Sequence, residues 1–130
     1  MVDSCVLLDV LTEDPKWFSW SSEQITQAAE NGFIIINPVI YSEISISFER
    51  IENIEAIFSD DVFVYRPISK EAAFLAGKCF LKYRQSGGNK SLPLPDFFIG
   101  AHASIESLPL ITRDVKRFQT YYPTLKLICP

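Results

Sequence analysis

Short apolar runs alternate with longer amphipathic segments along most of the chain. Residues 33–36 are continuously apolar, which favours a strand buried on both faces of a parallel sheet. Residues 1–3, 108–112 and 125–129 are also interpreted as strands. Residues 62–65 are strand-like but flanked by acids and a proline, so their place in the sheet stays open. Strands separated by helices predict an α/β fold.

Helices are predicted between these strands from apolar spacing and from residues that begin or end helices. Asp14 and Pro15 predict the start of the second helix, which ends at Asn31, and Pro38 predicts the start of the third. Apolar residues recur at helical spacing after Ser69. The predicted helices cover residues 4–11, 14–31, 38–48, 51–58, 69–83, 96–107 and 114–121.

Composition limits the class of protein. A chain of 130 residues, 48% of them hydrophobic, predicts one folded domain over residues 1–130. A net charge of −4 argues against a generally basic nucleic-acid coat, although bound metal could offset several acids. The three cysteines lack the spacing of a zinc site or a disulfide framework, so buried reduced thiols in a cytoplasmic protein are expected. No basic leader and no apolar run long enough to span a bilayer is visible, so no membrane association is expected.

Four acidic residues occupy equivalent places in the predicted elements. Asp3, Glu43, Asp96 and Asp114 each lie just past a strand or in the opening turns of the next helix. In an open parallel sheet these places face the crevice at the carboxyl ends of the strands. Carboxylates crowded there repel one another unless cations neutralise them. Oxygen ligands without histidine or cysteine favour Mg²⁺ or Mn²⁺, which activate water for hydrolysis of phosphate esters.

Each acid also has a simpler interpretation. Asp3 and Asp114 could be N-caps, and Asp96 could serve the helix dipole alone. Glu43 lies in an apolar stretch where a charged side chain rarely enters unpaired, although a surface stripe shared with Ser47 stays open. Taken jointly, the four acids are better explained by a metal site than by four separate coincidences.

Four motifs, in this order and spacing, resemble one known family. They are Val2–Asp9, Tyr41–Ile44, Pro95–Ala103 and Ile111–Phe118. Together they are similar to the PIN-domain ribonucleases, and in particular to the VapC-like toxins of toxin–antitoxin pairs. The resemblance implies a three-layer α/β/α sandwich around a central parallel sheet. It also implies a metal-dependent endoribonuclease that hydrolyses RNA phosphodiester bonds.

The resemblance also implies roles for individual residues and partners. The family's metal-binding and catalytic acids correspond to Asp3, Glu43, Asp96 and Asp114. Its supporting hydroxyl residues correspond to Ser4 and Thr112. Cys5 departs from the pattern, because the family most often has asparagine there, and a thiol is expected to pack as a small hydrophobe. The implied partners are RNA, a cognate antitoxin and a second copy of the chain as a homodimer.

Positive and aromatic side chains supply candidates for binding. Arg113, Lys116, Arg84 and Lys90 could contact an RNA backbone, and a solvated helix face is the alternative for the lysines of residues 78–82. The dense aromatic run at residues 17–20 predicts a protein interface, with either a second copy or an antitoxin. The single histidine is expected to be structural or on the surface.

Other functions compete with this interpretation. A haloacid-dehalogenase-like phosphatase needs a second aspartate at the place of Cys5, and a receiver domain needs an upstream acidic pair that is not evident. A catalytically silent PIN-like interaction module stays open, as does a PIN nuclease that acts in RNA processing rather than as a toxin.

Overall fold

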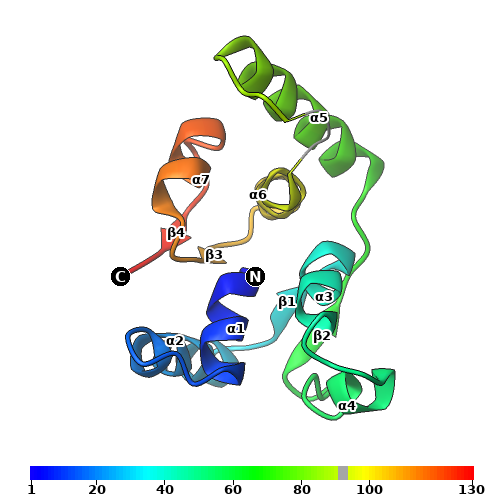
Figure 1. The fold of residues 1–130 in the computed structure, drawn as a ribbon, viewed down its shortest axis with the longest axis vertical. Coiled ribbons are helices and arrows are strands. Elements are labelled where there is room, and N and C mark those ends of the chain that lie inside the picture. The colour runs from blue at the N-terminus through cyan, green and yellow to red at the C-terminus, as the bar shows by residue number, and fades with distance from the viewer. Residues whose placement is uncertain (91–93) are drawn as a thin grey trace.

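The computed structural model describes residues 1–90 and 94–130 (Figure 1). Its helices are α1 (Ser4–Leu11), α2 (Phe18–Glu30), α3 (Pro38–Ser45), α4 (Ile51–Glu55), α5 (Lys70–Gln85), α6 (Pro95–Ile105) and α7 (Val115–Tyr121). Its strands are β1 (Ile34–Ile36), β2 (Phe63–Tyr65), β3 (Leu110–Ile111) and β4 (Leu127–Ile128).

The strands are all parallel, and the first residues of the chain lie between the two strand pairs. β1 pairs with β2, so that Ile34 faces Phe63, and β3 pairs with β4. Val2 forms a parallel bridge to Ile111, and its amide donates to the carbonyl of Ile35 at 3.4 Å. The order across the molecule is therefore β2, β1, the N-terminal segment, β3 and β4. The open question about residues 62–65 is answered by β2, which lies at one edge.

Helices cover both sides of this row of strands. In Figure 1, α6 and α7 lie on one side of it and α1 and α2 on the other. This arrangement confirms the predicted α/β sandwich with a central parallel sheet. The strands are shorter than predicted, because only residues 110–111 and 127–128 pair within the runs 108–112 and 125–129.

Local capping explains where the helices begin. Ser69 Oγ accepts from the amide of Ala72 and starts α5 as predicted. Asp14 instead holds a turn, since its Oδ1 accepts from the amides of Lys16 and Trp17, each at 2.9 Å. The helix α2 therefore begins at Phe18, later than Asp14 and Pro15 predict. The α4 helix ends at Glu55, because the chain turns there before β2.

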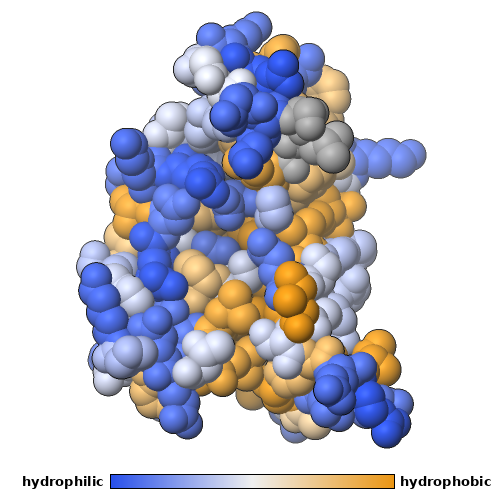
Figure 2. All heavy atoms as spheres, in the orientation of Figure 1, coloured by the Kyte–Doolittle hydropathy of each residue, from blue (hydrophilic) through white to orange (hydrophobic). Residues whose placement is uncertain are grey.

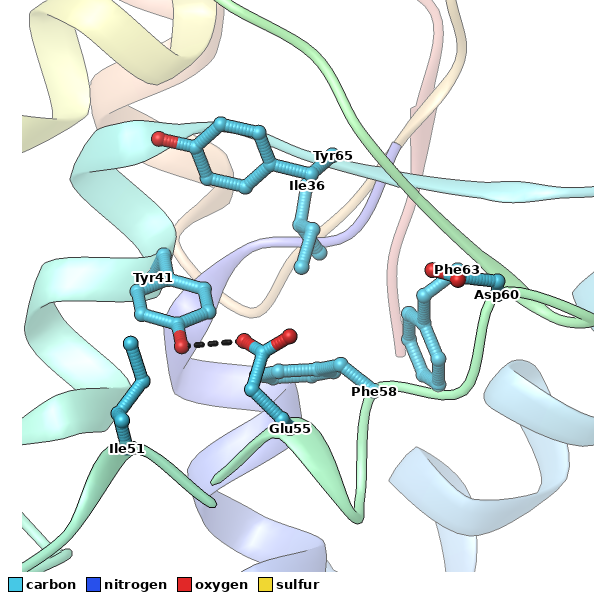
Figure 3. Close-up of a pocket in the computed structure, with 8 residues that line it drawn as sticks. All are labelled: Ile36, Tyr41, Ile51, Glu55, Phe58, Asp60, Phe63 and Tyr65. Atoms are coloured by element: carbon cyan, nitrogen blue, oxygen red, sulfur yellow. Dashed lines mark hydrogen bonds between the residues drawn. The ribbon is translucent and has the colours of Figure 1, made fainter. Parts of the chain in front are cut away.

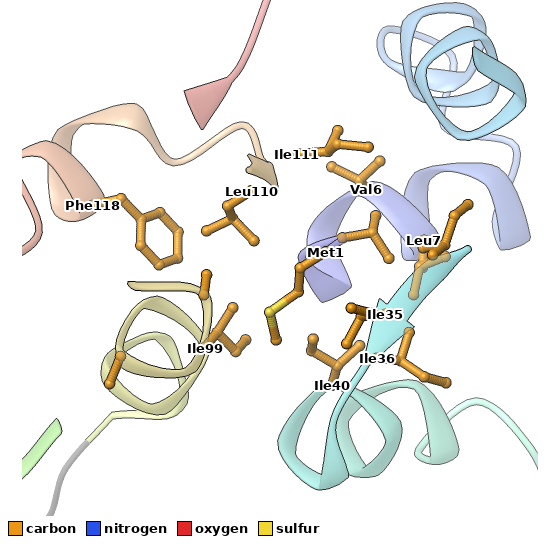
Figure 4. Packing of buried hydrophobic residues seen from close by; sticks show 14 of the residues in the cluster. Met1, Val6, Leu7, Ile35, Ile36, Ile40, Ile99, Leu110, Ile111 and Phe118 are labelled. Atoms are coloured by element: carbon orange, nitrogen blue, oxygen red, sulfur yellow. The ribbon is translucent and has the colours of Figure 1, made fainter. Parts of the chain in front are cut away.

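The core lies where the central strands meet α1, α3 and α6 (Figure 4). Ile34, Ile36 and Ile40 are almost completely buried, as the continuous apolar run predicts. Phe97 of α6 and Phe118 of α7 are almost completely buried in the same core. Over the described residues, no helix combines the length and apolar character needed to cross a membrane.

Candidate functional site

Asp3 is a buried carboxylate at the centre of the site. It ends the N-terminal segment, and its side chain is only 3% exposed. Thr112 Oγ1 donates to Asp3 Oδ2 at 2.6 Å, and Cys5 Sγ donates to the same oxygen at 3.3 Å. Ser4 Oγ makes a longer contact of 3.4 Å with Oδ1. Three side chains that carry no positive charge therefore surround Asp3.

Glu43 reaches the same place from α3. Ser4 Oγ donates to Glu43 Oε2 at 2.6 Å, which joins the α3 acid to the start of α1. The helix that carries Glu43 is fixed at its beginning by Asn37, whose Oδ1 accepts from the amides of Val39 and Ile40 at 3.0 and 2.9 Å. The pairing with Ser4 accounts for a glutamate in an apolar stretch.

Asp114 and Asp96 meet across Arg117. The Arg117 side chain forms an ion pair with Asp96, and its Nε lies 3.6 Å from Asp114 Oδ2. Asp114 is joined in turn to Thr112, whose Oγ1 accepts from the Asp114 amide at 3.0 Å. Thr112 therefore contacts both Asp3 and Asp114, which precede α1 and α7 respectively.

The four predicted acids belong to one continuous line of contacts. It runs from Glu43 through Ser4 to Asp3, then through Thr112 to Asp114 and through Arg117 to Asp96. Across residues 1–90 and 94–130, no three histidine, cysteine or acidic side chains are arranged to hold a metal ion as they stand. Arg117 places its positive charge beside both Asp96 and Asp114.

The alternative capping interpretations now separate. Asp3 has the N-cap position of α1, but its side chain makes no capping hydrogen bond. Asp114 does cap α7, because its Oδ1 accepts from the Arg117 amide at 3.2 Å. Capping therefore accounts for one oxygen of Asp114 and leaves Asp3 without that explanation.

The donor chemistry around Asp3 fits a hard divalent cation. In the described part of the chain, no arginine, lysine or histidine nitrogen forms an ion pair with Asp3 or Glu43. Burying an ionised carboxylate among neutral side chains costs free energy, and a bound cation would reduce that cost. Mg²⁺ and Mn²⁺ prefer carboxylate oxygens, which is the type of ligand that Asp3 and Glu43 could supply, with Asp96 and Asp114.

Cys5 acts as a hydrogen-bond donor rather than only as a small apolar group. Burial, together with the charge of Asp3, raises the pKa of the Cys5 thiol to about 12. The thiol therefore stays protonated and can donate to Asp3 Oδ2. The departure from the family's usual asparagine keeps a donor at this position. Of the other two thiols, Cys79 is buried, but Cys129 is exposed, contrary to the expectation of buried thiols.

Arg113 is held by a second buried acid. Its Nη2 lies 2.7 Å from Asp9 Oδ1, and Asp9, itself 3% exposed, also accepts from Ser21 Oγ at 2.7 Å. The guanidinium carbon is 5.2 Å from the centre of the Trp17 ring. These contacts tie the β3–α7 connection to α1 and α2, so the guanidinium proposed for RNA has a packing role of its own.

The other basic candidates lie in more open places. Lys116 is exposed on α7, two residues after Asp114. Arg84 Nη1 donates to the carbonyl of Lys90 at 2.8 Å, which holds the chain after α5. Among the described contacts, none joins Arg84 or Lys90 to the line of acids. Lys116 is therefore the best placed of these cations.

A second buried network was not foreseen from the sequence. His102, which is fully buried, lies between Asn37 Nδ2 at 3.2 Å and Glu106 Oε1 at 3.0 Å, and Glu106 pairs with Arg66. Burial opposes the charge of Glu106, but the hydrogen bonds from Arg66 and His102 lower the pKa of this carboxyl. The network joins α6, which carries Asp96, to Asn37 at the start of α3. The sequence offered one signal for this network: Asn37, directly before Pro38, is of a residue type that often caps helices.

Three of the solved structures that are similar to this chain are bacterial toxin–antitoxin complexes. VapBC2 from Rickettsia felis, bound to a DNA fragment from its promoter, is 20% identical, with a TM-score of 0.74 over 100% of this chain and 97% of that one. VapBC-1 from nontypeable Haemophilus influenzae is 21% identical, with a TM-score of 0.70 over 99% and 96%. DNA-bound VapBC from Salmonella typhimurium is 16% identical, with a TM-score of 0.71 over 99% and 96%.

Sequence comparison gives the family. Among proteins with curated functions, none matches this chain by sequence. The model of the PIN domain, however, matches residues 1–122, which is nearly the whole chain. The match spans all four acids and both supporting hydroxyl residues. The chain therefore belongs to the PIN domain family.

Proposed function

We propose that this protein is an Mg²⁺- or Mn²⁺-dependent endoribonuclease that acts as the toxin of a toxin–antitoxin pair. The observation that carries the proposal is the environment of Asp3. This buried carboxylate accepts hydrogen bonds from the neutral side chains of Thr112 and Cys5, pairs with no cationic side chain in the described residues, and is linked to three further acids.

Each residue of the site has a proposed role. Asp3, Glu43, Asp96 and Asp114 would hold the ion, which supplies an activated water and neutralises charge at the scissile phosphate when bound. Ser4 and Thr112 orient the carboxylates by donating to them. Lys116 is exposed beside the site and would attract the RNA backbone.

The partners follow from the same proposal. The three similar structures are toxin–antitoxin complexes, so a cognate antitoxin is the proposed regulator and the cytoplasm the proposed location. A homodimer is proposed as well, with the aromatic run at residues 17–20 as one candidate surface. Within this run Phe18 is 40% exposed.

Cleavage of RNA with and without metal tests the proposal. Wild-type protein should cut an RNA pool in Mg²⁺ or Mn²⁺ and stop growth on expression, and Asp3→Asn and Asp96→Asn should lose both effects. Lys126→Gln, an exposed charge change at the end of the chain, is the matched control. Undiminished cleavage in the aspartate variants would remove the assigned site.

Thermal stability in metal separates the main alternative. A ligand that binds only the folded state raises the melting temperature, so Mn²⁺ should stabilise wild type and not Asp3→Asn. A silent interaction module predicts no metal-dependent shift and no cleavage. A nuclease of RNA processing predicts the shift and the cleavage without growth arrest.

A further inference from the structure

A pocket of about 440 Å³ opens between α3, α4 and β2 and is lined by residues outside the line of acids (Figure 3). Four aromatic rings form much of its wall: Tyr41, Phe58, Phe63 and Tyr65. They touch in sequence, with ring centres 5.8 Å apart for Tyr41 and Tyr65, 6.1 Å for Tyr41 and Phe58, and 5.0 Å for Phe58 and Phe63. The pocket is therefore an aromatic surface rather than a purely aliphatic one.

Two carboxylates stand beside these rings. Glu55 Oε1 accepts from the Tyr41 hydroxyl at 2.5 Å, and Figure 3 shows its other oxygen on the pocket side. Asp60 lines the pocket next to Phe63. Aromatic faces attract cations, and desolvation strengthens that attraction. Rings and carboxylates together form a lining suited to an ammonium or guanidinium group.

The charge around the pocket is concentrated in one segment. Residues 49–61 hold five acidic residues and a single arginine, whereas the rest of the chain holds eleven acidic and eleven basic residues. The whole net charge of −4 therefore lies in the segment that carries Glu55 and Asp60. Such a field attracts a basic partner and repels the phosphates of RNA.

The shape of the surface indicates an extended partner. A second hollow of about 180 Å³ shares Tyr41 and Ile51 with the pocket and extends over the connection between α3 and α4, where Glu49 and Arg50 line it. Ile51 is 64% exposed and Tyr65 is 53% exposed, so apolar area is available beside the charge. Over α4, at the lower right of Figure 2, hydrophilic and hydrophobic residues lie side by side. Such a groove suits a chain that alternates cationic and apolar side chains.

We propose that this aromatic–acidic pocket binds an arginine or lysine side chain from a basic segment of a protein partner. The apolar neighbours of that side chain would lie on Ile51 and in the second hollow. Tyr41 lies on α3 with Glu43, but it faces the pocket while Glu43 pairs with Ser4. The pocket is thus separate from the line of acids, and the proposal does not depend on RNA cleavage.

Fluorescence anisotropy in EDTA tests the proposal without metal or catalysis. The probe is a fluorescein-labelled peptide of nine alternating arginine and leucine residues, with a twin in which citrulline replaces every arginine. We expect the citrulline twin to bind at least tenfold more weakly, since citrulline keeps the shape and loses the charge. Equal binding of the two peptides would overturn the proposal.

Matched variants locate the binding. The double variant Glu55→Gln, Asp60→Asn should bind the arginine peptide at least fivefold more weakly than wild type. Glu23→Gln with Glu30→Gln removes two exposed acids of α2 and should leave the affinity unchanged. Tyr65→Ser should lower the affinity for the arginine peptide and Tyr65→Phe should not. Circular dichroism confirms that both variants fold. Equal losses in the two pairs of acid variants would mean general attraction and would overturn the proposal.

Two other occupants have distinct signatures. If sedimentation finds a dimer that Tyr65→Ser dissociates, and the peptide does not bind, the pocket is an interface between copies and the proposal is wrong. If single-stranded RNA binds wild type, loses affinity in Tyr65→Ser and displaces the peptide, the ligand is nucleic acid and the proposal is again wrong.

Discussion

The Thr112 hydroxyl donates a 2.6 Å hydrogen bond to Asp3, although the two residues are 109 positions apart in the chain. The same oxygen accepts from the Asp114 amide. Asp3 lies on the N-terminal segment, Thr112 directly follows β3, and the two segments are neighbours in the parallel sheet. One buried hydroxyl therefore sets the relative position of two of the four acids.

Replacing this hydroxyl should affect stability strongly. Thr112→Val keeps the shape but removes the donor to Asp3 and the acceptor for Asp114, so we expect a loss of about 1–3 kcal/mol in the free energy of unfolding. Thr112→Ser keeps the hydroxyl and should lose less. Urea denaturation of both variants measures the difference. Equal stability of the valine variant and wild type would contradict the role assigned to Thr112.

Much of this arrangement followed from local patterns in the sequence. The apolar run at residues 33–36 predicted the buried strand β1, and parallel topology placed the four acids at one edge. The Arg117 bridge could not be foreseen, because nothing local in the sequence pairs Arg117 with Asp96, 21 positions earlier. Likewise, the buried pair of Asp9 and Arg113 joins opposite ends of the chain.

The local errors have local causes. Asp14 and Pro15 have the composition of a helix start, but the carboxylate holds a separate turn before α2. The predicted strands 108–112 and 125–129 were too long, because only two residues of each form paired ladders. Strand length depends on neighbours that are distant in sequence, and local patterns do not contain them.

Removing the Arg117 side chain should strengthen the binding of Mn²⁺. Arg117→Gln deletes the cation beside Asp96 and Asp114, so Mn²⁺ no longer has to displace it. The side chain is 41% exposed, and such a pair contributes at most about 1 kcal/mol, so the gain in Mn²⁺ affinity is at most about fivefold. Isothermal titration calorimetry measures the affinity, with Arg84→Gln as the charge-matched control. Weaker Mn²⁺ binding in Arg117→Gln would show that the arginine supports the site instead.

The Cys5 thiol should make stability fall at alkaline pH. The unfolded thiol ionises near its ordinary pKa of 9.0, whereas burial and Asp3 keep the folded thiol protonated to about 12. Between these values the folded state binds more protons than the unfolded state, so stability decreases as pH rises. Cys5→Ser keeps a donor without this ionisation. Chemical denaturation measures the free energy of unfolding from pH 8 to pH 11, and this free energy should fall less steeply with pH in Cys5→Ser than in wild type. An equal pH dependence in the two proteins would refute the assignment.

Two glycines should respond oppositely to alanine. A Cβ on Gly100 would lie 2.3 Å from the Tyr122 ring, whose hydroxyl donates to the carbonyl of Phe97, so Gly100→Ala should cost about 1–3 kcal/mol. Gly77, inside α5, has no atom within 4 Å of its Cβ position, and Gly77→Ala should gain about 0.5–1 kcal/mol. Calorimetric melting temperatures measure both. A stable Gly100→Ala would mean that the Tyr122 ring can move.

A double-mutant cycle on Asp9 and Arg113 can distinguish a structural role of the arginine from a role in binding RNA. Asp9→Asn removes the charge from the buried carboxylate, Arg113→Gln removes the guanidinium, and each should destabilise the fold by about 2–4 kcal/mol. The double variant should lose less than the sum, because the second change leaves no unpaired buried charge. Lys116→Gln, on exposed α7, should leave stability unchanged and weaken RNA binding. If Arg113→Gln weakened RNA binding without lowering stability, the arginine would serve the substrate rather than the packing of α1 and α2.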